Sequence, residues 1–265
     1  NGRITGGSIR FQNDDLAQKT PAQMRAIRGN EIAMIFQDPM TALNPVLTIG
    51  KQMAEILMRN KGLTQKVAKA AAIAMLEQVG IAEAERRYDQ YPHEFSGGMR
   101  QRVMIAIALS CNPKLLIADE PTTALDVTIQ AQILRLLKSL QQQTQTAILL
   151  ITHDLGVVAQ VCSRVVVMYG GLVMEEGSVE DIFYRPAHPY TQGLLASLPR
   201  PDEVNQRLSP IEGAPPGLLN PPPGCPFAER CPKRMPQCER QPAFYAMGEG
   251  HRAACWLWAD KEIQA

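Results

Sequence analysis

The sequence predicts an α/β fold, because short apolar runs typical of strands alternate along the chain with longer segments of helical periodicity. Two of these runs, "LLIADE" and "LLITHD", pass directly from apolar to polar residues, as strands do when they end at the edge of a parallel sheet. A chain of 265 residues is long enough to bury a substantial core and to hold one large domain with an appendage.

The expected elements follow from this pattern in chain order. Strands are predicted at residues 31–37, 115–120, 147–152 and 164–169, and the last of them turns through Gly170 and Gly171 into a hairpin. The strands at 115 and 147 are expected to be buried on both faces, because their residues are mostly apolar. Helices are predicted near residues 48–60, 64–79, 97–110, 127–141 and 154–162, with Asp126 placed to cap the fourth of them.

Charge and hydropathy restrict the class of protein. The chain has 27 basic and 26 acidic side chains, so its net charge of +1 provides no field that would hold it on nucleic acid or on an anionic membrane. No apolar run is long enough to span a bilayer, and no secretory leader is recognisable. We expect a soluble, cytoplasmic protein. The chain opens without Met inside a strand-like pattern, which suggests that an upstream segment has been removed.

Two adjacent acids, Asp119 and Glu120, close the predicted strand at 115–120. At the carboxyl end of a parallel strand the first acid can hold hydrated Mg²⁺ and the second can orient a water. A strand that ends in a solvated or capping acid gives the same local pattern, so the neighbouring motifs must distinguish the two interpretations.

Further polar groups stand at the ends of other elements. Ser96, Gly97 and Gly98 begin the helix predicted at 97–110, where a hydroxyl and uncovered N–H groups at the positive end of the helix dipole suit phosphate oxygens. The alternative is a serine cap followed by a flexible turn. His153 ends the strand at 147–152, a position where a lone histidine is usually structural.

Taken together, the motifs "IFQDP", "FSGGMRQR", "LLIADE", "TALD" and "LLITHD" resemble, in this order, the ATP-binding cassette ATPases that drive membrane transporters. The resemblance covers roughly residues 8–198 and implies a P-loop NTPase-like ATPase domain at 1–199, with a helical subdomain at about 40–112. It also implies ATP and Mg²⁺ at the site. In the family's terms, Gln37 senses the γ-phosphate and Mg²⁺, Asp119 binds Mg²⁺, and Glu120 is the catalytic glutamate.

The resemblance also implies roles at the dimer interface. It makes His153 the switch histidine and Asp126 the acid of an interface loop. It places the signature motif, which contacts the ATP of the partner subunit, at Ser96, Gly97, Gly98, Met99 and Gln101. Phe95 stands where the family usually has Leu, and Met99 where it usually has Gln, but the serine and both glycines that contact phosphate are intact.

The loop G-x-x-x-x-G-K-S/T, which cradles phosphates, does not occur in these residues. In the family it precedes the point where this chain begins, so we expect an N-terminal truncation and a chain that is inactive alone. Because two cassettes pair head to tail in the family, such a chain could still offer its signature motif to a second, identical or homologous ATPase subunit. A non-catalytic fragment that acts only as a dimerisation or binding partner is therefore the alternative of another class.

The segment "RPAHPYTQGLLASLP", residues 185–199, resembles the region after the cassette in oligopeptide and dipeptide importer ATPases. This resemblance implies an ATPase at the cytoplasmic face of the inner membrane, with two transmembrane permease subunits and, indirectly, an extracytoplasmic peptide-binding protein. Nickel or glutathione is the alternative cargo. DNA-repair ATPases would need a long insertion between Gln37 and Ser96, and translation-factor ATPases would carry two cassettes, so no nucleic acid partner is expected.

From about residue 200 the composition becomes proline-rich and linker-like, and a small cysteine-containing tail follows from Gly224, so a separate region is expected at 200–265. Cys111 and Cys162 are expected to be small buried residues next to helices. The tail contains C-x5-C-x6-C-x16-C, formed by Cys225, Cys231, Cys238 and Cys255. Zinc usually takes a C-x2-C pair, and disulfides suit a cytoplasmic ATPase poorly, but both stay open, as do free thiols. Irregularly spaced thiolates also suit a 4Fe-4S cluster, which the family resemblance implies in this region.

Overall fold

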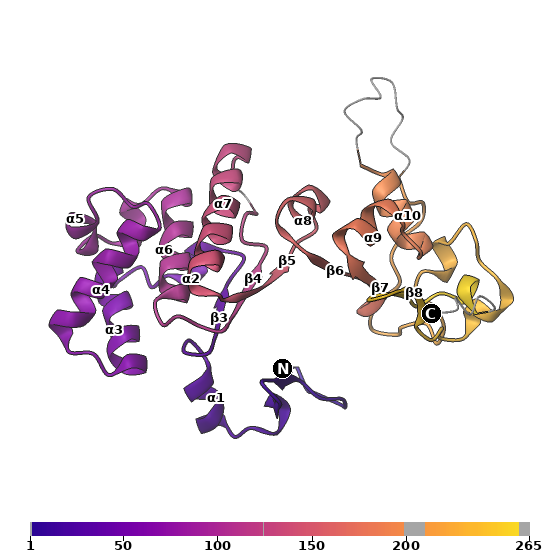
Figure 1. Cartoon of the computed structure of the whole chain (residues 1–265), viewed down its shortest axis with the longest axis horizontal. Coiled ribbons are helices and arrows are strands. Elements are labelled where there is room, and N and C mark those ends of the chain that lie inside the picture. The colour runs from indigo at the N-terminus through magenta and orange to yellow at the C-terminus, as the bar shows by residue number, and fades with distance from the viewer. Residues whose placement is uncertain (1, 124, 199–209, 260–265) are drawn as a thin grey trace. The chain divides into compact units, whose positions relative to one another are not determined.

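The computed structural model describes residues 2–123, 125–198 and 210–259. The chain divides into two compact units, Asn1–Asp154 and Leu155–Ala265 (Figure 1). Among the described residues no helix combines the length and the apolar composition needed to cross a membrane. The first part of the predicted linker, residues 200–209, lies outside the described residues.

The first unit contains a three-stranded parallel sheet in the order β3 (Ile32–Ile35), β4 (Leu115–Asp119) and β5 (Ala147–Ile151). Helices α6 (Gly97–Leu109) and α7 (Val127–Thr144) bury Ile35, Leu116 and Ala118 of the sheet beneath Ile105 and Ile133. The parallel register brings the carboxyl ends of β4 and β5 to one edge, since Asp119 lies opposite Ile151. The predicted strands and the two helices are therefore confirmed.

A helical part follows β3 in the chain and is made of α2 (Pro39–Ala42), α3 (Ile49–Lys61), α4 (Gln65–Gln78) and α5 (Ala84–Tyr88). Its core is continuous with that of the sheet and includes Met53, Leu76 and the first residue of α3, Ile49. Thr48 caps α3 by accepting a hydrogen bond from the N–H of Lys51, and Gly62 ends that helix at a φ of +66°. The helices expected near 48–60 and 64–79 are confirmed.

Two details of the expected elements are wrong. The strand at 147 is not buried on both faces, since Leu149 and Ile151 are 51% and 45% exposed. Within the described residues β5 is an edge strand of the sheet, and α6 and α7 cover only the face that holds Leu116 and Ala118. Asp126 does occupy the N-cap position of α7, but its side chain makes no capping hydrogen bond to the first turn.

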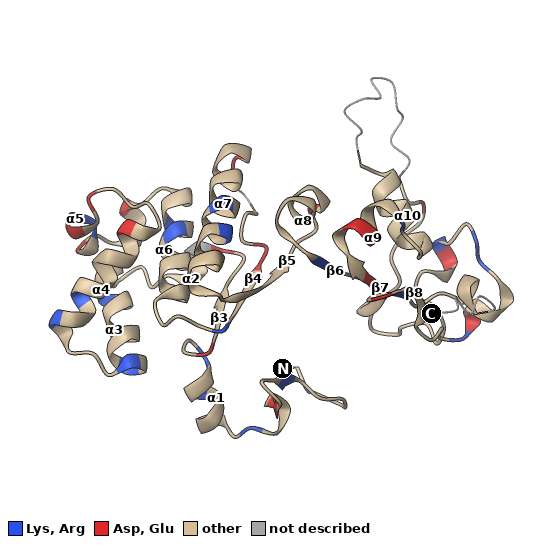
Figure 2. Ribbon diagram, in the orientation of Figure 1, with Lys and Arg blue, Asp and Glu red and all other residues tan. Residues whose placement is uncertain are grey.

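The N-terminal segment of the first unit consists of short elements. It contains β1 (Arg10–Phe11), β2 (Asp14–Asp15), the 3₁₀ turn η1 (Leu16–Gln18) and α1 (Pro21–Ile27). Thr20 and Gln23 form a capping box at the start of α1. Along the helices of the first unit, Lys and Arg residues outnumber Asp and Glu residues, and α1, α6 and α7 carry no acidic side chain (Figure 2).

The second unit is built on a four-stranded antiparallel sheet in the order β6 (Arg164–Tyr169), β7 (Leu172–Ser178), β9 (His251–Ala253) and β8 (Tyr245–Gly248). The helices are α8 (Leu155–Val161), α9 (Val179–Tyr184) and α10 (Pro189–Ala196), and the 3₁₀ turns are η3 (Ala228–Arg230), η4 (Pro236–Glu239) and η5 (Trp256–Trp258). The predicted hairpin is confirmed, with Gly170 and Gly171 at positive φ. The cysteine tail contributes β8 and β9, so it extends the sheet that β6 and β7 begin.

Candidate functional site

Asp119 and Glu120 lie at the carboxyl edge of the parallel sheet. Asp119 is the last residue of β4, and the N–H of Glu120 donates to the carbonyl of Ile151 on β5 at 2.9 Å. Glu120 has a φ of +44°, a left-handed conformation that is unusual for a side chain of this kind. The strand therefore stops with an abrupt change of direction, which turns Glu120 toward the residues that follow β3 and β5.

The Glu120 carboxylate accepts hydrogen bonds from three segments of the chain. Thr123 Oγ1 donates at 2.8 Å, Gln37 Nε2 donates at 3.0 Å, and His153 Nδ1 lies 3.1 Å from the second carboxylate oxygen. The hydrogen bonds from Thr123 and then His153 hold the pKa of the Glu120 carboxyl below its usual range. Glu120 is thus ionised at neutral pH and can accept a proton or orient a water.

Among the predicted residues, the structure therefore brings Gln37, Glu120 and His153 together, with Asp119 beside them in the chain. Thr123 was not predicted, although a hydroxyl three residues after an acid, within "DEPTT", is a spacing that allows a local hydrogen bond. The His153 side chain is 77% exposed, so it is free to reach a group that approaches this edge.

Ser96 is the N-cap of α6 and accepts a hydrogen bond from the N–H of Met99 at 3.4 Å. The two glycines that follow differ in their surroundings. Among the described residues, a Cβ atom added to Gly97 would meet nothing within 4 Å, whereas one added to Gly98 would lie 2.9 Å from Cγ2 of Ile129 on α7. Gly98 is therefore needed for packing, and Gly97 leaves the helix terminus open to an external group.

Gln101 and Asp126, which were expected near the dimer interface, lie in different environments. Gln101 is 2% exposed, and its side-chain amide donates to the carbonyl of Pro121, the residue after Glu120. Asp126 is exposed at the start of α7. Gln101 therefore connects the helix that starts at Gly97 with the loop that follows the two acids.

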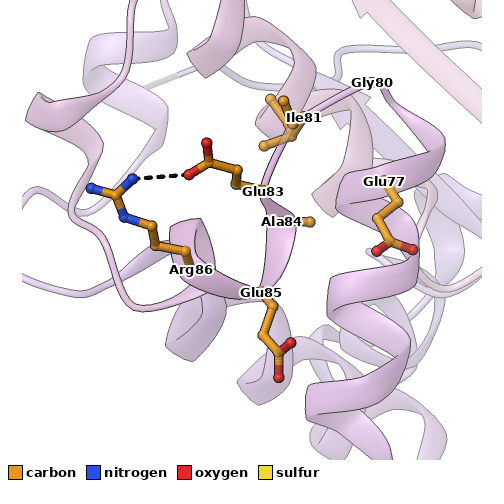
Figure 3. Close-up of a pocket in the computed structure, with 8 residues that line it drawn as sticks. Glu77, Gly80, Ile81, Glu83, Ala84, Glu85 and Arg86 are labelled. Atoms are coloured by element: carbon orange, nitrogen blue, oxygen red, sulfur yellow. Dashed lines mark hydrogen bonds and ion pairs between the residues drawn. The ribbon is translucent and has the colours of Figure 1, made fainter.

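A solvent-open hollow lies away from these residues, at the connection between α4 and α5. It has a volume of about 810 Å³ (Figure 3). Glu77 and Glu85 line it, together with Glu83 and Arg86, whose side chains form an ion pair of 2.9 Å. None of the predicted site residues lines this hollow.

In the second unit, the four tail cysteines line one small cavity. They are Cys225, Cys231, Cys238 and Cys255. The N–H of Cys225 donates to the carbonyl of Cys238 at 3.0 Å, which ties two of the cysteine-bearing segments together. Burial raises the pKa of the Cys225 and Cys231 thiols and raises that of Cys255 to about 11. Without a bound cation these three thiols are therefore protonated at neutral pH.

None of the six cysteines is disulfide-bonded. Within the part of the chain that the structure describes, no group of three or more His, Cys, Asp or Glu side chains is arranged to hold a metal ion. Cys111 is buried, as expected, and its sulfur accepts a hydrogen bond from Asn60 at 3.7 Å. Cys162, expected to be buried as well, is only half-buried, and burial raises its pKa.

Comparisons with protein families agree with the two parts of this arrangement. A family model described as "ABC transporter" matches residues 2–123, and one described as "Oligopeptide/dipeptide transporter, C-terminal region" matches residues 174–238. The chain is 57% identical to the dipeptide transport ATP-binding protein of Bacillus subtilis, over 96% of this chain and 76% of that protein. It is 52% identical to the oligopeptide transport ATP-binding protein of Haemophilus influenzae, over 98% of this chain and 80% of that protein.

Solved structures give the same result for the fold. A dimeric bacterial ABC transporter cassette superposes with a TM-score of 0.59 and 29% identity, over 66% of this chain and 74% of that one. A dimeric post-hydrolysis state of an ATP-binding cassette, bound to ADP and phosphate, also gives a TM-score of 0.59, with 28% identity and the same coverage.

Proposed function

Because the chain belongs to the ABC transporter family, we propose that it is the ATP-binding and ATP-hydrolysing subunit of an importer that takes up di- or oligopeptides. The match of residues 174–238 to the oligopeptide/dipeptide transporter C-terminal region supports this substrate class, as do the names of the relatives that cover nearly the whole chain. Nickel or glutathione is the alternative cargo, and a non-catalytic binding partner is the alternative of another class.

The observation that carries the catalytic part of this proposal is the environment of Glu120. Its carboxylate is held by Gln37, Thr123 and His153, which follow three different strands, so its position depends on the whole edge of the sheet. Glu120 orients the attacking water and accepts its proton, and His153 contacts the transferred phosphoryl group. Asp119 would hold Mg²⁺, which would offset the charge of the phosphates.

The N-terminus of α6, where Gly97 leaves space for an external group, supports a contact with the ATP of a second ATPase subunit. Ser96, Gly97 and Gly98 offer a hydroxyl and backbone N–H groups to the phosphates of an ATP held by a second ATPase subunit, and Met99 belongs to the same turn. Gln101 couples this turn to the loop after Glu120, and Asp126 faces the partner at the start of α7. The partners are a second cassette subunit and two permease subunits at the cytoplasmic face of the membrane, with a peptide-binding protein acting outside.

The test is uptake by vesicles that contain the permease subunits, the second ATPase and a form of this chain extended at its N-terminus by a phosphate-binding loop. We expect ATP-dependent uptake of a labelled di- or oligopeptide. Glu120→Gln should retain ATP binding while hydrolysis and uptake fall by about 10²–10⁴-fold. Uptake of nickel or glutathione instead of peptide would identify the alternative cargo, and a normal rate of hydrolysis by Glu120→Gln would make Glu120 merely the end of a strand.

For the tail we propose a 4Fe-4S cluster held by Cys225, Cys231, Cys238 and Cys255, with zinc as the alternative. Two observations support this group: four thiols from separate segments line one cavity, and no carboxylate side chain is among its lining residues. In the positions that the structure describes, the thiols do not converge on one metal ion. The four thiolates would cross-link a region that has a small apolar core.

The cluster proposal is tested on protein purified without oxygen. The protein should be brown and should contain iron and acid-labile sulfide at about four each per chain. Cys231→Ser should bleach it and make residues 210–259 sensitive to protease, whereas Cys111→Ser is the matched control and should do neither. Colourless protein that carries one zinc ion per chain, or a disulfide between tail cysteines in freshly lysed cells, would contradict the cluster.

A further inference from the structure

His188 is buried next to the cysteine cavity and is held at two points. It is the N-cap of α10, where its Nδ1 accepts a hydrogen bond from the N–H of Tyr190 at 3.0 Å. Its own backbone N–H donates to the carboxylate of Glu175 at 2.9 Å. The residue is 1% exposed, so the ring has one fixed orientation and no contact with solvent.

These contacts determine where the imidazole carries its proton. The Nδ1 atom accepts a hydrogen bond and therefore carries no proton, so the ring is in a neutral form. Because Nδ1 accepts a hydrogen bond, the proton of the neutral ring is on Nε2. That Nε2 atom is buried and has no hydrogen-bond partner within the described residues. Leaving a buried donor unpaired is unfavourable, so an acceptor is expected beside it.

The cavity supplies only one kind of side-chain acceptor. His188 lines it together with the four tail cysteines, Lys233, Met235 and Trp256. Lys233 and Trp256 can only donate, and they do so to Gln192 and to the carbonyl of Arg240. The remaining side-chain acceptors are the thioether sulfur of Met235 and the four cysteine sulfurs, and each of them already accepts at least one hydrogen bond. A thiolate sulfur is a stronger acceptor than a thioether because it carries negative charge, so a cysteine sulfur is the acceptor expected for the N–H of His188.

We propose that the Nε2–H of His188 donates a hydrogen bond to a sulfur of the centre held by the four cysteines and thereby raises its reduction potential. The inference rests on the 4Fe-4S cluster proposed above. A hydrogen bond to a cluster sulfur stabilises the reduced state more than the oxidised state, because the reduced state carries more negative charge. His188 is a positioning residue, and the four thiolates are the ligands. The two ring nitrogens have different roles, because Nδ1 caps α10 and Nε2 contacts the centre.

Two substitutions separate the two nitrogens. His188→Asn places an acceptor where Nδ1 lies and keeps the cap, but it removes the distal donor. His188→Gln places an amide N–H near the position of Nε2 and loses the cap. Thr191→Val is the matched control, because Thr191 is on the same helix and also has a buried polar atom without a partner, yet it does not line the cavity.

The measurement is a redox titration of the anaerobically purified chain, with the cluster followed by electron paramagnetic resonance. His188→Asn should lower the equilibrium constant for reduction about tenfold, which is about 59 mV for a one-electron couple. His188→Gln and Thr191→Val should stay near the wild-type potential. Thermal unfolding should show the opposite ranking for the first two, with His188→Gln less stable than His188→Asn because it lacks the cap.

Each outcome decides the inference. Equal reduction potentials in the wild type and His188→Asn would overturn the role of His188 and leave the cluster proposal intact. Loss of iron from both His188 variants would have the same two consequences. A wild-type chain that takes up no iron and sulfide would overturn the cluster and this inference together. Loss of iron from His188→Asn alone, with a normal unfolding temperature, would support the inference, because the two variants differ in the donor at the position of Nε2.

Discussion

Gly97→Asp should abolish ATP-dependent dimerisation without destabilising the chain. A Cβ atom at Gly97 meets nothing within 4 Å, so the substitution creates no clash. Asp at the first position of α6 adds a negative charge at the positive end of the helix dipole, which is worth about 0.3–1 kcal/mol of added stability. We propose that the phosphates of an ATP held by the partner subunit approach Ser96 and Gly97. The same carboxylate would occupy that position and repel the phosphates, so ATP-dependent closure of the dimer should be lost.

Gly98→Ala is the matched comparison, because its effect should be structural. The new Cβ atom would lie 2.9 Å from Cγ2 of Ile129, about 0.6–1 Å inside the optimal separation of two carbon atoms. Overpacking of this kind costs about 1–3 kcal/mol, and the higher helix propensity of alanine returns at most about 1 kcal/mol. We therefore expect a net loss of about 1 kcal/mol. Adding Ile129→Leu, which moves the branch away from Cβ, should restore most of it.

Urea unfolding of the chain measures the stability of each variant. Dimerisation is measured by gel filtration with ATP, in a form that carries an N-terminal phosphate-binding loop and Glu120→Gln to slow hydrolysis. If Gly97→Asp still dimerises with ATP, the start of α6 does not contact phosphate across the dimer. If Gly97→Asp lowers the free energy of unfolding as much as Gly98→Ala does, a loss of dimerisation can no longer be assigned to the phosphate contact. The steric argument for Gly97 would then fail.

The remaining predictions concern the acid that follows β4 and the end of α7. Thr123→Val should raise the pKa of Glu120, because the hydrogen bond from Thr123 is the largest cause of its depression. If the ionised Glu120 is the base, as we propose, the acid limb of the ATPase pH profile should move to higher pH. An unchanged acid limb would show that another group titrates there. Gln145→Gly should stabilise the chain by about 1 kcal/mol in urea unfolding, because Gln145 ends α7 at a φ of +56°. Gln141→Gly, inside the same helix, should instead destabilise it by about 1 kcal/mol, and equal effects of the two changes would contradict the role of backbone conformation.

Residues that follow a strand could be placed from the sequence, because the carboxyl ends of parallel strands meet at one edge. Asp119, Glu120 and His153 were located in this way, and the structure brings Gln37 to the same carboxylate. The burial of a strand could be predicted less well from the sequence than the position of the residues that follow it. The run "AILLI" is apolar enough for a central strand, yet β5 is exposed on alternate residues, since exposure depends on which elements cover the sheet.

Side-chain contacts in the interior could not be predicted from the sequence for a related reason. Gln101 belongs to a recognisable motif, but its contact with Pro121 joins residues 20 positions apart and depends on how α6 packs on the sheet. His188 lies in the segment at 185–199, whose local pattern does not indicate any chemistry for this side chain. Its tautomer follows from one hydrogen bond to Tyr190 and from its burial, and neither of these is written in a local sequence pattern.

Glu175 explains why the cysteine tail and the segment around His188 behave as one structure. Its carboxylate is fully buried on β7 and accepts hydrogen bonds from the N–H groups of Ala187 and His188, while His251 Nε2 lies 2.8 Å from it. Burying a polar side chain is costly unless such hydrogen-bond partners are present, so β7, the start of α10 and β9 must form together. The orientation of His188 toward the cavity thus depends on a residue of the tail, His251, that shares its acceptor. If the proposed cysteine centre forms, its loss should therefore loosen β9 and α10 as well as the cysteine-bearing loops.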